Sequence, residues 1–132
     1  FKLMSGTWVH VGAVRVKLIA AANPVIQDAV LTGHDRDEVG ALVFLNPATT
    51  KDMDAATIRA GIAAALRAMA GEGGSSMHPT RALVMAEPAS IDANEITDKG
   101  YINQRAVLER RAALVERLHA NPTPPDVVTA AG

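Results

Sequence analysis

The sequence predicts a small α+β fold, in which a three-stranded sheet is flanked by helices and preceded by a short two-stranded hairpin. The central strand is predicted by a nearly continuous apolar run at residues 39–45, which is typical of a strand buried on both faces. The segments around it follow the order β-β-α-β-β-α-β-α. With 132 residues, 48% of them hydrophobic and 20% charged, the chain has the size and composition of one globular domain.

The first 24 residues contain a predicted hairpin and a predicted helix. Residues 1–11 favour two short strands around a turn at Ser5 and Gly6, because β-branched and aromatic residues flank a glycine that can adopt a positive φ. Apolar residues then recur at helical spacing over residues 14–22, and Pro24 ends that helix.

The middle of the chain alternates strand and helix. A strand is expected at residues 25–32, a charged turn at 33–38 and the central strand at 39–45. The next helix is expected to end at Gly71, and a further strand follows at residues 81–86. The apolar face of this helix comprises Ile58, Ile62, Leu66 and Met69.

The last third combines an irregular segment, one long helix and a tail. Residues 88–100 are polar and irregular, and residues 102–120 are expected to form a helix about 28 Å long. Its core-facing residues are expected to be Leu108, Ala112, Val115 and Leu118. Arg105 and Glu109 should form an exposed i,i+4 pair. Because several prolines prevent a helix, residues 121–132 are expected to be a loose tail outside the domain at 1–120.

Charge and composition exclude several classes of function. The net charge of −1 offers little attraction to polyanions, so nucleic acid is not expected as a partner. Few side chains could stack on bases: Phe1, Trp8, Phe44 and Tyr101. No apolar run approaches the roughly 18 residues of a membrane span, so no membrane partner is expected.

The absence of cysteine and the first residue of the chain bear on its origin. Without cysteine the chain has no disulfide, thiol catalysis or cysteine-based zinc site, which fits a reducing cytoplasm. The chain starts at Phe1 in strand-like sequence rather than at an initiator methionine. We therefore expect a fragment of a longer protein.

Three features that resemble sites have simpler explanations. The four histidines lack ligand spacing, so we expect solvated or capping side chains and no metal. The glycine-rich residues 71–76 follow a helix and precede a strand, which is the reverse of a phosphate loop, so a flexible connector is expected. Asp92, Glu95 and Asp98 are expected in an exposed loop, with Asp92 capping a turn.

Lys99 is the remaining candidate for chemistry. It lies between Asp98 and Gly100, just before the predicted last helix. A lysine supplies a compact, mobile positive charge that suits phosphate or a developing oxyanion. By its chemistry alone, however, a surface lysine beside an aspartate is the more common interpretation.

Three stretches change that interpretation because of their order and spacing. They are the lysine-containing strand and turn glycine at residues 1–11, the glycine–charged turn–glycine sequence at 33–44, and Glu-Ile-Thr-Asp-Lys at 95–99. Together they resemble the C-terminal domain of the adenylate-forming superfamily, which includes acyl-CoA synthetases, luciferases and peptide-synthetase adenylation domains. The resemblance covers nearly all of residues 1–120. Within the superfamily, residues 27–38 and 95–105 are most similar to the feruloyl-CoA synthase group.

The resemblance places the catalytic lysine of this superfamily at Lys99. Members usually carry Thr/Ser-Gly-Lys before the last helix, whereas here Asp98 precedes the lysine and Gly100 follows it. A two-residue shift would put Tyr101 at that position. The retained Thr97-x-Lys99 spacing favours Lys99.

The resemblance also implies a mechanism and a set of partners. A carboxylate and ATP give an acyl-adenylate and pyrophosphate, after which the thiol of CoA displaces AMP. Lys99 would act in the first step, whereas Ser5, Gly6 and Thr7 would lie near CoA in the second. ATP, CoA and Mg²⁺ would bind the full-length enzyme, together with an aromatic carboxylic acid such as ferulate.

The expected protein partner is the enzyme's own large N-terminal adenylation domain, and the isolated fragment is expected to be inactive. Two alternatives remain open. One is the lid of a ligase that loads a carrier protein, and the other is a non-catalytic α+β interaction module.

Overall fold

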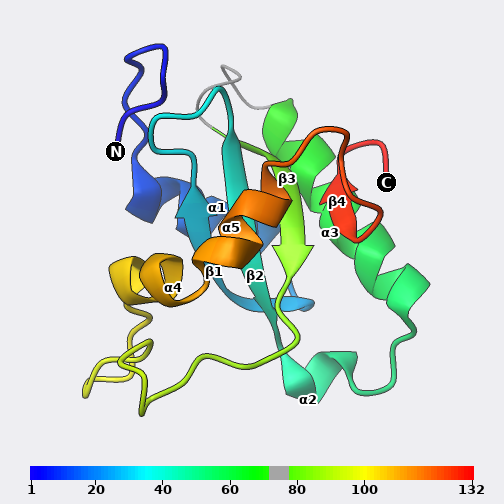
Figure 1. Ribbon diagram of the computed structural model, residues 1–132. Coiled ribbons are helices and arrows are strands. Elements are labelled where there is room, and N and C mark those ends of the chain that lie inside the picture. Colours follow the sequence, from blue (N-terminus) through cyan, green and yellow to red (C-terminus); the bar gives the residue numbers. More distant parts are fainter. Residues whose placement is uncertain (72–77) are drawn as a thin grey trace.

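A four-stranded sheet with helices on both faces forms the framework of the domain (Figure 1). The computed structural model describes residues 1–71 and 78–132. In spatial order the strands are β1 (Ile26–Thr32), β2 (Val39–Leu45), β3 (Pro79–Val84) and β4 (Val127–Thr129). β2 pairs antiparallel with β1 and parallel with β3, and β4 pairs antiparallel with β3. The predicted fold class is confirmed, with one more strand than expected.

The helices divide into two layers. The first layer packs on one face of the sheet and consists of α1 (Val11–Ala21) and α3 (Ala55–Ala70). The second layer packs on the other face and consists of α4 (Gln104–Arg110) and α5 (Ala112–Leu118). A single turn of helix, α2 (Pro47–Thr50), follows β2. Alternate residues of β2 enter the two cores: Val43 faces the first layer, whereas Leu42 and Phe44 face the second. The expected burial of this strand on both faces is confirmed.

Local sequence explains where α3 begins and ends and where α4 begins. Asp54 accepts a hydrogen bond from the Thr57 amide at 2.7 Å and caps α3, which ends at Gly71 as predicted. Asn103 caps α4 through the Ala106 amide. The rest of the glycine-rich stretch at residues 71–76 lies outside the described residues.

The expectation of a loose tail at residues 121–132 is wrong for β4. Val127 and Val128 are almost fully buried, and their strand extends the sheet beyond β3. Arg59 of α3 donates hydrogen bonds to the carbonyl oxygens of Pro125 and Val127 at 2.7 and 3.0 Å. The prolines do prevent a helix, but the β-branched residues after them favour an edge strand.

The expected long helix at residues 102–120 is also wrong, because it breaks at Arg111. This residue has φ −105° and ψ 30°, which separates α4 from α5. The break changes the buried face: Val107 and Leu118 are buried, whereas the predicted core residue Ala112 is exposed. Leu108 and Val115 are only partly buried.

Element boundaries otherwise shift by a few residues. α1 starts three residues earlier than expected, and β3 lies two residues before the predicted 81–86. A bridge between Lys2 and Trp8 confirms the N-terminal hairpin. In the part of the chain that the structure describes, no helix has the length and hydropathy needed to span a membrane.

Candidate functional site

Lys99 lies at the tip of a tight hairpin between β3 and α4. The Thr97 amide donates to the Tyr101 carbonyl oxygen at 2.8 Å, and the Gly100 amide donates to the Thr97 carbonyl oxygen at 2.9 Å. Gly100 has φ +84°, a conformation that residues with a side chain rarely adopt. Asp98 and Lys99 therefore occupy the two central positions of the turn.

The Lys99 ammonium group faces solvent. Within residues 1–71 and 78–132 it has no hydrogen bond or ion pair, and the predicted neighbour Asp98 is also exposed and forms no ion pair with it. Tyr101, the alternative position, has 67% of its surface exposed. Both side chains are free to reach a ligand or another domain, so the preference for Lys99 stays a prediction.

A buried carboxylate supports the base of this hairpin. Glu95 is fully buried, whereas Asp92 and Asp98 are exposed. The expectation of an exposed acidic loop is therefore wrong for Glu95. The turn cap is also different, because the Ser90 hydroxyl, not Asp92, accepts a hydrogen bond from the Ala93 amide. Hydrogen bonds from Arg111 hold the pKa of Glu95 below its usual value, with smaller contributions from the Ser90 amide and the charge of Arg110, against the opposing effect of burial.

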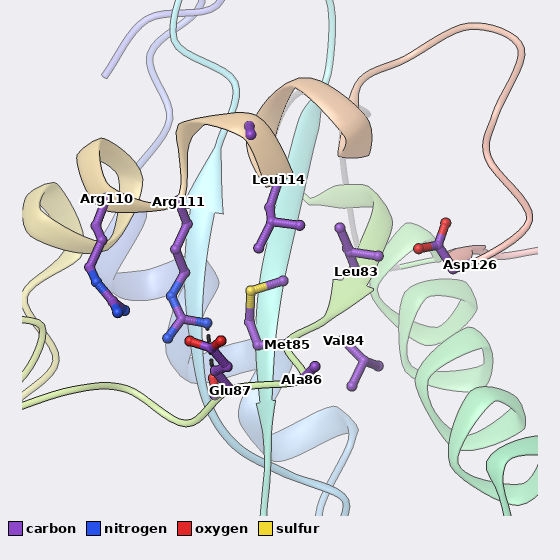
Figure 2. Close-up of a pocket in the computed structure, with 10 residues that line it drawn as sticks. Leu83, Val84, Met85, Ala86, Glu87, Arg110, Arg111, Leu114 and Asp126 are labelled. Atoms are coloured by element: carbon purple, nitrogen blue, oxygen red, sulfur yellow. Dashed lines mark hydrogen bonds between the residues drawn. The ribbon is translucent and has the colours of Figure 1, made fainter.

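Arg111 is the principal partner of Glu95. Its Nε and Nη2 atoms donate to the two carboxylate oxygens at 2.8 and 3.0 Å. The same guanidinium donates to the carbonyl oxygens of Glu87 and Pro88 and lies 5.0 Å from the centre of the Phe44 ring. In Figure 2, Arg111 extends from the junction of α4 and α5 to the backbone at Glu87. Its side chain thus ties the segment after β3 to the second helical layer.

Sequence reasoning missed this ion pair, although one signal was present. Arg111 falls at helical spacing on an apolar stripe formed by Val107, Leu114 and Leu118, next to the face that was predicted to be buried. A charged residue on an apolar face implies a buried partner of opposite charge. The sequence does not show that the partner is Glu95.

The N-terminal hairpin has the same backbone geometry as the Lys99 hairpin. The Leu3 amide donates to the Thr7 carbonyl oxygen and the Gly6 amide to the Leu3 carbonyl oxygen, both at 2.9 Å. Gly6 has φ +89°, and Ser5 precedes it at the tip, where its hydroxyl contacts the Thr7 hydroxyl at 3.1 Å. Three residues predicted near CoA, Ser5, Gly6 and Thr7, therefore form one compact turn.

The two hairpins lie off opposite ends of the sheet (Figure 1). Hydrogen bonds tie the N-terminal hairpin to the turn between β1 and β2: the Met4 amide donates to the Arg36 carbonyl oxygen, and the Asp35 amide to that of Lys2. The Lys99 hairpin lies at the other end, near the start of β1. β1 and β2 each contain seven residues, and a strand of that length spans roughly 20 Å.

Two grooves lie in this part of the molecule, and Arg111 lines one of them. An open groove of about 510 Å³ lies under the Lys99 hairpin and is lined mainly by apolar side chains, among them Phe44, Ile96 and Ile102. A second groove of about 440 Å³ lies between α5 and the end of β3, with Leu83, Met85 and Leu114 on its surface (Figure 2). The described residues thus leave the Lys99 hairpin open on the side of the first groove.

The histidines have more varied surroundings than predicted. His10 and His34 are exposed as expected, but His78 is buried and His119 is partly buried with its Nε2 atom 2.6 Å from the Thr32 hydroxyl. Among the described residues, no group of three or more histidines and carboxylates is arranged to hold a metal ion.

Comparison with known families identifies the class of domain. Residues 9–122 match the family model of the AMP-binding enzyme C-terminal domain. The chain belongs to this family, the C-terminal domain of AMP-binding enzymes. No curated protein matches the chain.

Solved structures with this fold include the adenylation domains of carboxylic acid reductases. The adenylation domain from Mycobacterium chelonae has a TM-score of 0.76 and 19% identity over 92% of this chain. The A-PCP didomain from Segniliparus rugosus, in complex with AMP, has a TM-score of 0.71 and 20% identity over 88% of this chain. The A domain from the same organism, in complex with AMP and a co-purified carboxylic acid, has a TM-score of 0.72 and 19% identity over 90%. This chain spans only 16–19% of the length of these proteins.

Proposed function

We propose that this chain is the mobile lid of an ATP-dependent acyl-CoA synthetase and that Lys99 is its adenylation lysine. The observation that carries the proposal is the Lys99 ammonium, which has no partner among the described residues and lies at the tip of an anchored hairpin in a domain of the AMP-binding family. A positive charge held in this way can bind an anion without first breaking an internal ion pair.

Lys99 acts in the first half-reaction. A carboxylate oxygen of the acid attacks the α-phosphorus of ATP, the bond to the pyrophosphate oxygen breaks, and acyl-adenylate and pyrophosphate form. The Lys99 ammonium bridges the carboxylate and an α-phosphate oxygen, which orients the attack and stabilises the charge that develops on the phosphate. Mg²⁺ bound with ATP would neutralise phosphate charge, and we propose that residues of the large domain would hold it, since no group of described residues here is arranged to bind a metal.

The N-terminal hairpin acts in the second half-reaction, after the lid rotates. The thiol of CoA attacks the acyl carbon, a thioester forms, and AMP leaves. At Gly6 a Cβ atom would meet no atom of the other described residues within 4 Å, so the backbone there is open to an approaching chain or ligand. We assign Ser5, Gly6 and Thr7 to the surface that borders the pantetheine of CoA.

The acid is proposed to be aromatic, of the hydroxycinnamate class. This part of the proposal rests on the similarity of residues 95–105 to the feruloyl-CoA synthase group. A second candidate acceptor is the pantetheine of a carrier protein, because one structural neighbour is an A-PCP didomain, an adenylation domain joined to a carrier domain. Thioester formation with CoA alone would favour the synthetase.

The test compares Lys99→Ala with Tyr101→Phe in the full-length enzyme, using ATP–pyrophosphate exchange. We expect Lys99→Ala to slow exchange by about 10²–10³-fold, the usual cost of removing one charge-stabilising group from a transition state. Tyr101→Phe should stay near wild type. The reverse pattern would assign the role to Tyr101, and two near-normal variants would favour the non-catalytic interaction module.

A further inference from the structure

Glu95 is the point where three separate segments meet. Its Oε1 atom accepts hydrogen bonds from the Ser90 amide and from Arg110 and Arg111 at 2.9–3.0 Å, and its Oε2 atom accepts from Arg111 at 2.8 Å. Its backbone is also engaged, because its amide donates to the Ser90 carbonyl oxygen and its carbonyl oxygen accepts from the Asn103 amide. These contacts fix both the side chain and the main chain of Glu95.

The Lys99 hairpin starts directly from this fixed point. Ile96, the next residue, forms an antiparallel bridge with Ile102, and the tip extends from that bridge. The Asn103 amide closes the other side of the hairpin base on Glu95. Any displacement of Glu95 must therefore move both strands of the hairpin and its tip.

Arg111 prevents such a displacement from two sides. It holds Glu95 and, through the carbonyl oxygens of Glu87 and Pro88, the segment that leads from β3 to the hairpin. Its own position is set by the break between α4 and α5 and by contact with Phe44 of β2. The fully buried pair thus couples the hairpin to the sheet and to the second helical layer.

We propose that Glu95, held by Arg111 and Arg110, is a positioning residue that fixes the Lys99 hairpin for adenylation. This inference rests on the proposed function of Lys99. An apolar pair could fill the same space without a large loss of stability, so the buried charges indicate a requirement for one fixed geometry. A displacement of a reacting group by about 1 Å can slow a reaction by about 10²-fold.

The experiment is a double-mutant cycle between Glu95→Gln and Lys99→Ala in the full-length enzyme. Two rates are measured: ATP–pyrophosphate exchange, and thioester formation from pre-made acyl-adenylate. We expect Glu95→Gln to lower kcat for exchange by about 10–100-fold, with little change in KM for ATP. Thioester formation should stay within about 3-fold of wild type. In the Lys99→Ala background, Glu95→Gln should change exchange by less than about 2-fold, because it acts through Lys99.

A second variant distinguishes the positioning role from an effect of misfolding. Arg111→Lys keeps a positive charge beside Glu95 but loses the planar fork that reaches Glu95, Glu87 and Pro88 together. It should slow exchange selectively as well. Val107→Ala is the matched control, because it removes buried volume from α4 without touching the ion pair. At a temperature where all variants are folded, it should leave both half-reactions near wild type.

The outcomes separate the two proposals. If Lys99→Ala leaves exchange unchanged, the proposed function fails. If Lys99→Ala slows exchange but Glu95→Gln and Arg111→Lys do not, only the positioning role fails. Equal losses in both half-reactions, or losses that multiply in the double variant, would also overturn the positioning role and leave Glu95 as a purely structural residue.

Discussion

Gly40 and His119 show how single residues determine the packing between β2 and the second helical layer. A Cβ atom at Gly40 would lie 2.8 Å from both the Leu118 side chain and the Thr32 hydroxyl, and 3.2 Å from Nε2 of His119. Because Leu118 is fully buried and Thr32 contacts His119, neither can move aside easily. The second glycine of the glycine–charged turn–glycine sequence is therefore required by close packing.

His119 lies beside the same close contact at Gly40, and its surroundings favour the neutral form of the imidazole. Burial first, and then the charges of Arg36 and Arg81, lower its pKa to about 4 against the opposing effects of Glu38 and Glu116. In the unfolded chain a histidine takes up a proton near its ordinary pKa of 6.5. Between these two values the unfolded state binds more protons, so stability falls as the pH falls.

This difference predicts a pH dependence of stability. Between about pH 7 and about pH 5, the free energy of unfolding should fall by about 1–2 kcal/mol because of His119. Urea unfolding of this chain at constant ionic strength measures it. In His119→Gln, which keeps a hydrogen-bonding group near Thr32, this part of the pH dependence should disappear. An unchanged slope in the variant would contradict the assignment.

At the scale of elements, the sequence predicts best where the signal is local. The strand at residues 39–45 is found with the predicted bounds, because a charged turn precedes an uninterrupted apolar run. The break at Arg111 was missed because no glycine or proline marks it. At the break, Arg111 pairs with Glu95, a partner 16 residues away along the chain. β4 was missed for the same reason, since its pairing partner β3 lies more than forty residues earlier.

In the candidate site, too, prediction succeeded where the signal was local and failed where it depended on distant contacts. The turn that carries Ser5 was predicted from Gly6, whereas the turn at Lys99 was not, because residues 88–100 were expected only to be polar and irregular; in the structure both Gly6 and Gly100 have a positive φ. The support beneath Lys99 could not be predicted, because the burial of Glu95 depends on contacts from α4 and α5 that local sequence does not encode.

The contribution of β4 to the stability of the domain can be tested by shortening one of its buried side chains. Val128 is 2% exposed and packs against the core shared by α3 and β3, so Val128→Ala should lower the free energy of unfolding by about 2 kcal/mol. Val16→Ala is the matched control, since Val16 is 61% exposed on α1 and the change should have almost no effect. Chemical denaturation measures both. Equal and small effects would mean that β4 does not stabilise the domain.

At the scale of the whole molecule, the sheet separates two similar hairpins. Each consists of a tight turn with a positive-φ glycine, and they lie off opposite ends of β1 and β2 (Figure 1). With a seven-residue strand between them, the two tips cannot enter one small-molecule site together. This arrangement supports the central proposal that the domain presents one hairpin for adenylation and, after rotation, the other for thioester formation.

The two glycines offer a matched pair for the most direct test. Gly6 and Gly100 have nearly equal φ values, and in the part of the chain that the structure describes a Cβ atom at either would meet nothing within 4 Å. The backbone strain of an alanine should therefore be similar at both positions, about 1–3 kcal/mol, so a difference in activity must come from what each tip contacts outside the domain.

The measurement is the rate of each half-reaction in full-length Gly6→Ala and Gly100→Ala. We predict that Gly100→Ala slows ATP–pyrophosphate exchange and spares thioester formation from pre-made acyl-adenylate, whereas Gly6→Ala spares exchange and slows thioester formation. If both variants slow the same half-reaction, or slow both by the same factor, the assignment of the two hairpins to different steps is wrong.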